Sequence, residues 1–110
     1  LFYAPGLGAP DDTIAAIAAD ADCLLVDGTF FTETEMIDQG VGTKPAATMG
    51  HLPQSGDAGM LAWLSRFPDT RRVLIHINNT NPILDPDSAE RAAVENGGVE
   101  VAFDGMEITL

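Results

Sequence analysis

Apolar residues along the chain follow two patterns: short unbroken runs, and runs in which they recur every three or four positions. The short unbroken runs predict β-strands of the kind found in a parallel sheet covered on both faces. The predicted strands occupy residues 1–4, 23–26 and 73–77. The recurring pattern predicts amphipathic helices between these strands. Because strands alternate with helices along the chain, the sequence predicts an α/β fold.

Polar residues indicate where the first two predicted helices begin. Asp11 and Asp12 open the first helix, because carboxylates are favourable at the positive end of the helix dipole. Thr32 and Glu35 have the spacing of a capping box at the start of a short second helix.

The third and fourth predicted helices follow the longest irregular stretch, residues 40–54. The third helix should be capped by Ser55 or Asp57 and has one apolar stripe. That stripe consists of Met60, Leu61, Leu64 and Phe67. A fourth helix should start near Asp87 and end at the glycine pair 97–98, since glycine favours the C-terminal end of a helix.

The C-terminal residues alternate on both sides of Asp104-Gly105. An Asp-Gly pair between alternating runs is a strong signal for a β-hairpin, so we predict hairpin strands over residues 99–103 and 106–110.

No repeat or linker divides the chain, and residues 1–110 are predicted to form one domain. The chain opens within a predicted strand, and its strands lack evident partners at the sheet edges. Since open edges favour aggregation, we expect a partial domain, the C-terminal part of a longer chain that is inert by itself.

Charge and cysteine content narrow the possible functions. Seventeen acidic and five basic residues give a net charge of −12, which disfavours binding to nucleic acid or to an anionic membrane. No apolar run approaches the roughly 20 residues of a membrane span. The single cysteine, Cys23, excludes a disulfide and a thiolate zinc cluster within these residues, and its apolar neighbours predict a buried thiol. We therefore expect a cytoplasmic protein.

His76 is the first candidate functional residue, because it ends an apolar strand and precedes a polar loop with Asn78, Asn79 and Asn81. A neutral imidazole in this place could bind Zn²⁺ or Fe²⁺, with the asparagines orienting it. It could equally be a hydrogen-bonded histidine at a strand end.

His51 and Asp27 are the other two candidates. His51 lies between Gly50 and Pro53 and could be a metal ligand, a proton shuttle or an ordinary loop residue. Asp27 ends an apolar strand and could ligate a metal, hold a histidine in one tautomer or cap the turn that follows. Catalytic metal sites usually have three protein ligands. Two histidines with carboxylates therefore indicate an incomplete site.

Four segments of the chain together resemble the C-terminal third of the pyrroloquinoline quinone (PQQ) biosynthesis protein B family. These segments are Tyr3-Ala4-Pro5-Gly6-Leu7, Leu25-Val26-Asp27-Gly28-Thr29-Phe30, Met49-Gly50-His51-Leu52-Pro53 and residues 76–84 from His76 to Leu84. The resemblance implies a metallo-β-lactamase fold, a four-layer αββα sandwich of two similar halves, with this chain forming the C-terminal half. The missing N-terminal half would then be a partner of these residues, and a homo-oligomer is also possible.

The resemblance also implies roles for individual residues. His76 resembles the final metal-ligand histidine of the superfamily, and Asp27 and His51 resemble an acid–histidine pair that handles protons beside the metal. Nothing here matches the His-x-His-x-Asp-His ligand cluster of the superfamily, and Pro5-Gly6-Leu7 replaces the segment that supplies a bridging aspartate. We therefore expect one metal ion, iron or zinc, rather than two.

Three functions are compatible with this resemblance. The first is metal-dependent hydroxylation of the tyrosine-derived ring of a PQQ precursor, a small or peptide-derived molecule. The second is a soluble carrier that takes part in transport of PQQ or its precursor to the periplasm. The third is a metal-dependent hydrolase, because most members of the superfamily are hydrolases.

Overall fold

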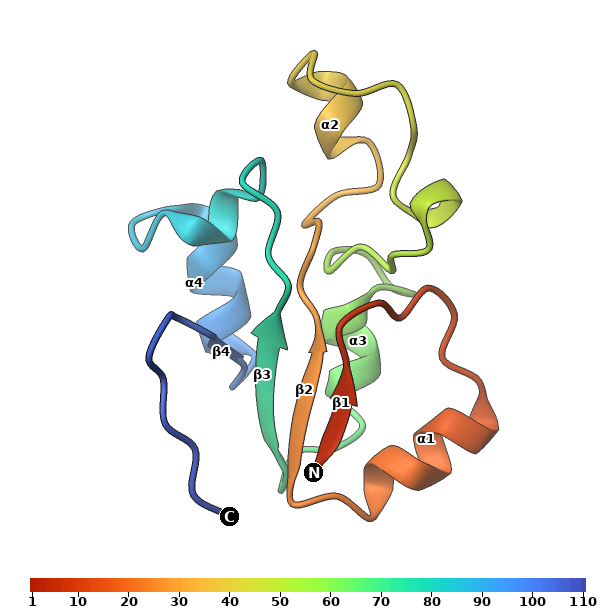
Figure 1. Ribbon diagram of the computed structural model, residues 1–110, viewed down its shortest axis with the longest axis vertical. Helices are drawn as coiled ribbons and strands as arrows, with labels where there is room; N and C mark the ends of the chain where they lie inside the picture. Colours follow the sequence, from red (N-terminus) through yellow and green to blue (C-terminus); the bar gives the residue numbers. More distant parts are fainter.

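A parallel four-stranded sheet is the centre of the computed structural model, which describes all residues 1–110 (Figure 1). The strands are β1 (Phe2–Ala4), β2 (Cys23–Asp27), β3 (Arg71–Ile75) and β4 (Glu100–Val101). Their order in the sheet is β1-β2-β3-β4, and each pair of neighbours is parallel. The carboxyl ends of all strands therefore meet at one edge of the sheet, which is where parallel α/β folds place their chemistry.

Four short helices connect the strands. They are α1 (Asp12–Ala19), α2 (Glu35–Asp38), α3 (Met60–Leu64) and α4 (Ala89–Asn96), with 3₁₀ turns at Ala47–Met49 and Pro82–Leu84. None of these helices is long and apolar enough to cross a membrane.

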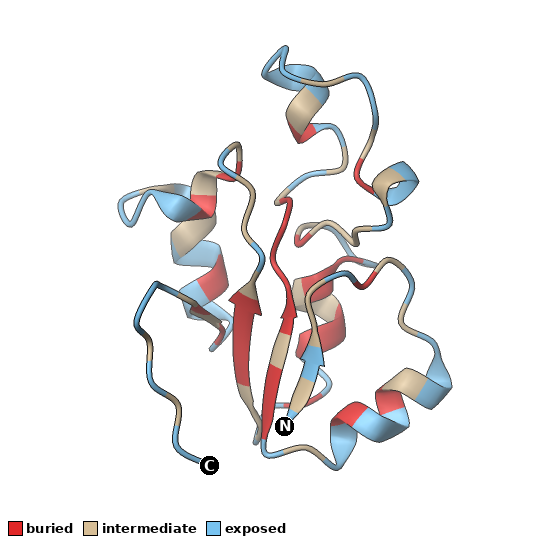
Figure 2. Cartoon of the chain, viewed as in Figure 1, coloured by how far each residue is buried: buried red, intermediate tan, exposed pale blue.

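The hydrophobic core lies on one face of the sheet. Leu24, Val26 and Leu74 point toward this face and pack with Met60 and Leu64 of α3, and residues of α1 and α4 belong to the same cluster. Figure 2 shows the buried positions gathered on β2, β3 and the inner sides of the helices. On the opposite face, Cys23 and Val73 are fully buried, and the sheet is open at its β1 edge.

The open edge is clearest at β1, where Tyr3 pairs in register with Leu25 and is 65% exposed. One helical layer on one face of a sheet is half of an αββα arrangement. Cys23 is fully buried, as predicted, and burial raises the pKa of its thiol.

The three predicted strands are confirmed; β1 and β2 each differ from the prediction by one residue at one end, and β3 is shifted by two. β3 starts two residues earlier than predicted and ends at Ile75, because His76 adopts a left-handed backbone conformation with φ 57°. The first helix is confirmed, with the Asp11 side chain accepting a hydrogen bond from the backbone N–H of Ile14. The last helix is also confirmed, and Gly98, at φ 74°, follows its end.

Both middle helix caps were predicted wrongly. Thr34, not Thr32, precedes α2, and the Glu35 carboxylate accepts hydrogen bonds from the Phe31 N–H and the Thr80 hydroxyl. Gly59 precedes α3 in place of Ser55 or Asp57, and glycine has no side chain that could cap the helix. At the start of α3, the N–H groups of Met60 and Leu61 donate to the carbonyls of Pro53 and Gln54. In both places contacts with other segments outweigh the local signal.

The predicted C-terminal hairpin is wrong. Residues 100–101 form β4, which pairs parallel with β3, and residues 106–110 form no strand. The Asp104-Gly105 pair still makes a tight turn, because Gly105 has φ 85° and the Met106 N–H donates to the Phe103 carbonyl. Pairing with β3 buries Val101 in the core, which a two-stranded hairpin could not do.

Candidate functional site

Asp27 is the last residue of β2, and it lies fully buried at the carboxyl edge of the sheet. The next residue, Gly28, donates its N–H to the Ile75 carbonyl at 2.7 Å, which continues the contact between β2 and β3. A Cβ atom at Gly28 would lie 2.9 Å from the same carbonyl oxygen. Glycine at this position therefore allows the two strand ends to approach closely.

His76 immediately follows β3 and is the only non-glycine residue with a positive φ. A left-handed conformation costs an L-residue about 1–2 kcal/mol, so the surrounding contacts must hold it. Its imidazole Nδ1 lies 2.9 Å from the Thr29 hydroxyl. The strained backbone thus ends the strand and turns the side chain toward the segment that follows β2.

His51 reaches the same edge from the loop after the 3₁₀ turn Ala47–Met49. Gly50 ends this turn with φ 81°, and the His51 N–H donates to the Ala46 carbonyl at 3.1 Å. The following residue, Leu52, donates its N–H to the Leu7 carbonyl at 3.0 Å, which joins this loop to the segment after β1.

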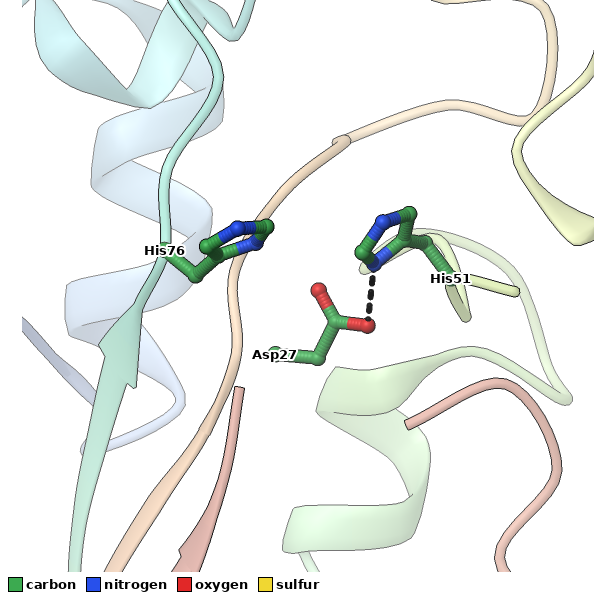
Figure 3. Close-up of side chains that lie close together, drawn as sticks. All are labelled: Asp27, His51 and His76. Carbon is green, nitrogen blue, oxygen red and sulfur yellow. Dashed lines mark hydrogen bonds and ion pairs between the residues drawn. The ribbon is translucent and has the colours of Figure 1, made fainter. Parts of the chain in front are cut away.

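Asp27, His51 and His76 converge, with one possible ligand atom from each residue within 4.8 Å of the others (Figure 3). The two imidazole rings are stacked, with centroids 5.5 Å apart and planes 25° apart. Asp27 is buried, His51 is half-buried and His76 is exposed, so the cluster runs from the interior to the surface. The structure therefore brings together all three residues singled out in the sequence.

The Asp27 carboxylate accepts four hydrogen bonds. Oδ2 accepts from the Leu7 N–H at 2.9 Å and lies 2.8 Å from His51 Nδ1. Oδ1 accepts from the N–H of Thr29 at 3.0 Å and from its hydroxyl at 2.7 Å. Turn capping and histidine orientation, which the sequence left as alternatives, thus occur together.

Thr29 is the residue of this cluster that the sequence analysis missed as a functional candidate. Its hydroxyl lies within hydrogen-bonding distance of all three cluster members. The sequence did contain a signal for Thr29: it lies two residues after Asp27, and alternate residues of an extended segment point to the same side.

No asparagine after His76 makes a hydrogen bond to its imidazole, so any effect of these residues on the ring is indirect. Asn78 donates its side-chain N–H to the Thr80 hydroxyl. Asn81 is buried and donates to the carbonyls of Gly28 at 3.0 Å and Thr29 at 3.3 Å. The loop after His76 therefore supports the segment that follows β2. Through Thr29, this segment also contacts the imidazole of His76.

The donor set fits a divalent transition metal, because imidazole nitrogen is a good ligand for zinc and iron. Nδ1 of each histidine faces a protein oxygen, whereas Nε2 of each makes no hydrogen bond within the chain. The carboxylate oxygens of Asp27 are already occupied by four donors. The Nε2 atoms are thus the donors best available to a metal.

A protein family described as the β-lactamase superfamily domain matches residues 1–77 of the chain. Coenzyme PQQ synthesis protein B from Pseudomonas putida strain W619 is 63% identical over 110 residues, which is all of this chain and 36% of that protein. The protein of the same name from Methylobacillus flagellatus is 57% identical over 109 residues, again 36% of its length. The chain thus spans about a third of these curated relatives.

A solved structure supports the same relationship. The crystal structure of Zn²⁺-bound PqqB from Methylobacterium extorquens is 46% identical to this chain, with a TM-score of 0.94 over 98% of this chain and 39% of that one. The resemblance to the PQQ biosynthesis protein B family is therefore confirmed. So is the fold class, the C-terminal part of a metallo-β-lactamase-like fold.

Proposed function

The chain belongs to the β-lactamase superfamily, and on that premise we propose that its residues form part of a metal-dependent site that acts in the synthesis of coenzyme PQQ. The convergence of Asp27, His51 and His76 at the carboxyl edge of the sheet carries this proposal. Residues 1–110 would be one partial domain, with further ligands supplied from outside them.

His76 is the proposed metal ligand, and its Nε2 is the binding atom. It is the most exposed member of the cluster, and its Nδ1 is held by Thr29. One ion, iron or zinc, is proposed rather than two. When bound, zinc would supply Lewis acidity, and iron would in addition supply redox chemistry.

Asp27 and His51 are the proposed proton-handling pair. The buried carboxylate of Asp27 contacts Nδ1 of His51 at 2.8 Å, which fixes the orientation of the ring. Nε2 of His51 then remains free to accept a proton from the substrate. The proposed reaction is hydroxylation of the tyrosine-derived ring of a PQQ precursor with O₂ as the oxidant. One oxygen atom would replace a ring hydrogen, which leaves as a proton, and the other would leave as water with two electrons from an external reductant.

The test compares two histidine variants in the natural protein that carries these residues. His76→Ala should lower the bound metal per protein chain, and His51→Gln should retain the metal and slow turnover by about 10²–10⁴-fold, the usual contribution of an acid–base residue. Metal content is measured by atomic emission, and turnover as oxygen consumed with the precursor present. Unchanged metal content in His76→Ala would refute the ligand role.

The same assay separates the competing functions. A carrier of PQQ or its precursor would bind the molecule without consuming oxygen. A hydrolase would cleave a phosphodiester or lactone substrate in the absence of oxygen. Either result would replace the proposed hydroxylation.

A further inference from the structure

We propose that Thr29 is a positioning residue that sets the tautomer of His76, whose ring then carries its proton on Nδ1 and presents a free lone pair on Nε2. His51 has the same tautomer, which Asp27 holds together with Thr29. The assignment of tautomers stands on hydrogen-bond geometry alone. Only the use of those lone pairs, for a metal at His76 and a proton at His51, rests on the proposed function.

The contacts of the Thr29 hydroxyl match its full hydrogen-bonding capacity. Oγ1 lies 2.7 Å from Asp27 Oδ1, 2.9 Å from His76 Nδ1 and 3.1 Å from His51 Nδ1. A hydroxyl has one proton to donate and two lone pairs that accept. Three partners therefore require one donated bond and two accepted bonds.

The direction of these bonds follows from Asp27. A carboxylate only accepts, so the single hydroxyl proton of Thr29 is donated to Oδ1, which is also the shortest of the three contacts. The hydroxyl can then only accept from the two imidazoles. Each Nδ1 must carry a hydrogen, and each neutral ring is left with an unprotonated Nε2.

The two histidines depend on Thr29 to different extents. His51 Nδ1 has a second acceptor, Asp27 Oδ2, at the shorter distance of 2.8 Å. His76 Nδ1 has no other partner within the chain. Loss of the hydroxyl should therefore release the tautomer of His76 and leave that of His51 in place.

The structure holds Thr29 firmly enough for this role. Thr29 is only 5% exposed, and its backbone N–H donates a hydrogen bond to Asp27 Oδ1. Its carbonyl accepts from the Asn78 N–H at 3.1 Å and from the Asn81 side chain at 3.3 Å. Because both asparagines belong to the loop after His76, that loop holds the residue that orients the imidazole of His76.

The experiment measures imidazole tautomers by ¹H–¹⁵N multiple-bond correlation NMR on the metal-free natural protein that carries these residues. Spectra are recorded at about pH 8, where an ordinary imidazole is neutral. His51→Gln and His76→Gln identify the two signals. The variants compared are Thr29→Val, which keeps the shape without the hydroxyl, and Thr29→Ser, which keeps the hydroxyl.

In the unmodified protein both rings should show the Nδ1–H tautomer. In Thr29→Val, His76 should change to a mixture in which Nε2–H predominates, as it does for a free neutral imidazole, and His51 should not change. Thr29→Ser should restore the original pattern. An Nε2–H tautomer for His76 in the unmodified protein would overturn the proposal without any variant, and so would an unchanged His76 in Thr29→Val.

A second measurement, the affinity for Zn²⁺, tests separately whether His76 is the metal ligand. Zn²⁺ affinity, measured by competition with a chromophoric chelator, should fall about tenfold in Thr29→Val, the usual effect of losing a partner that orients a ligand, and should recover in Thr29→Ser. A tautomer change without a change in Zn²⁺ affinity would support the positioning role of Thr29. That result would count against His76 as the metal ligand.

Discussion

His51 and Asp27 lie 24 positions apart in the chain and meet through a 2.8 Å contact between imidazole Nδ1 and carboxylate Oδ2. The carboxylate is fully buried, and the imidazole is half-buried. The same carboxylate accepts backbone hydrogen bonds from Leu7 and Thr29, so it joins the segments after β1 and β2 to the loop that carries His51. This single side chain therefore connects three segments of the chain at the candidate site.

Asp27→Asn should destabilise the protein, because an amide offers one acceptor oxygen where four donors now face two. Leaving buried donors unpaired costs about 1–3 kcal/mol. We expect the free energy of unfolding, measured by urea denaturation, to fall by roughly 2 kcal/mol. Glu95→Gln, on the exposed face of α4, is the control and should change little. Equal stability of Asp27→Asn and the unmodified protein would show that the four donors find other partners.

His76→Gly should be more stable than His76→Ala. Both variants lose the imidazole and its contact with Thr29, but only glycine adopts φ 57° without steric cost. The difference in free energy of unfolding should be about 1 kcal/mol in favour of glycine. Both variants should lose the same amount of metal affinity. A less stable glycine variant would indicate that the left-handed conformation is not strained.

Gly28→Ala should separate the ends of β2 and β3. The added Cβ would lie 2.9 Å from the Ile75 carbonyl oxygen and 2.9 Å from Leu74 Cβ, and backbone cannot yield as a flexible side chain does. Destabilisation of roughly 1–3 kcal/mol is expected, as for other overpacked sites, with loss of metal affinity because Asp27 and Thr29 flank this residue. Gly6→Ala is the matched control, since its Cβ would meet only the edge of His51 at 4.0 Å. Equal effects of both substitutions would contradict this account.

The ion pair between Arg71 and Glu100 should make the attachment of β4 dependent on pH. The hydrogen bond from Arg71 lowers the pKa of Glu100 in the folded protein, whereas in the unfolded chain the group titrates near its ordinary value of about 4.3. The stabilisation is therefore present above that value and is lost as the pH falls through the lower pKa of the folded state.

Unfolding measured from about pH 6 down to pH 3 should show a smaller loss of stability in Glu100→Gln than in the unmodified protein. The difference should be small, because both side chains are more than a third exposed, and it should shrink at high salt. A difference that is unaffected by salt would contradict the assignment to this pair.

Local sequence signals were sufficient where one pattern decides the structure. The apolar run at residues 23–26 can only be buried as a short strand, and Asp11 has both the side chain and the position to cap α1. They failed where distant residues compete. The run at 99–103 had a local partner beyond Asp104-Gly105, yet the edge of β3 buries more apolar surface and Val101 pairs there.

The sequence by itself determined the α/β alternation, the identity of the three candidate side chains and their places at the ends of strands or in a loop. It could not determine that residues 27, 51 and 76 meet, because that depends on the strand order and on contacts such as Leu52 with Leu7. The role of Thr29 was decided by tertiary structure for the same reason. A hydroxyl acquires a direction of proton donation only when its partners, drawn from three separate segments, are in place around it.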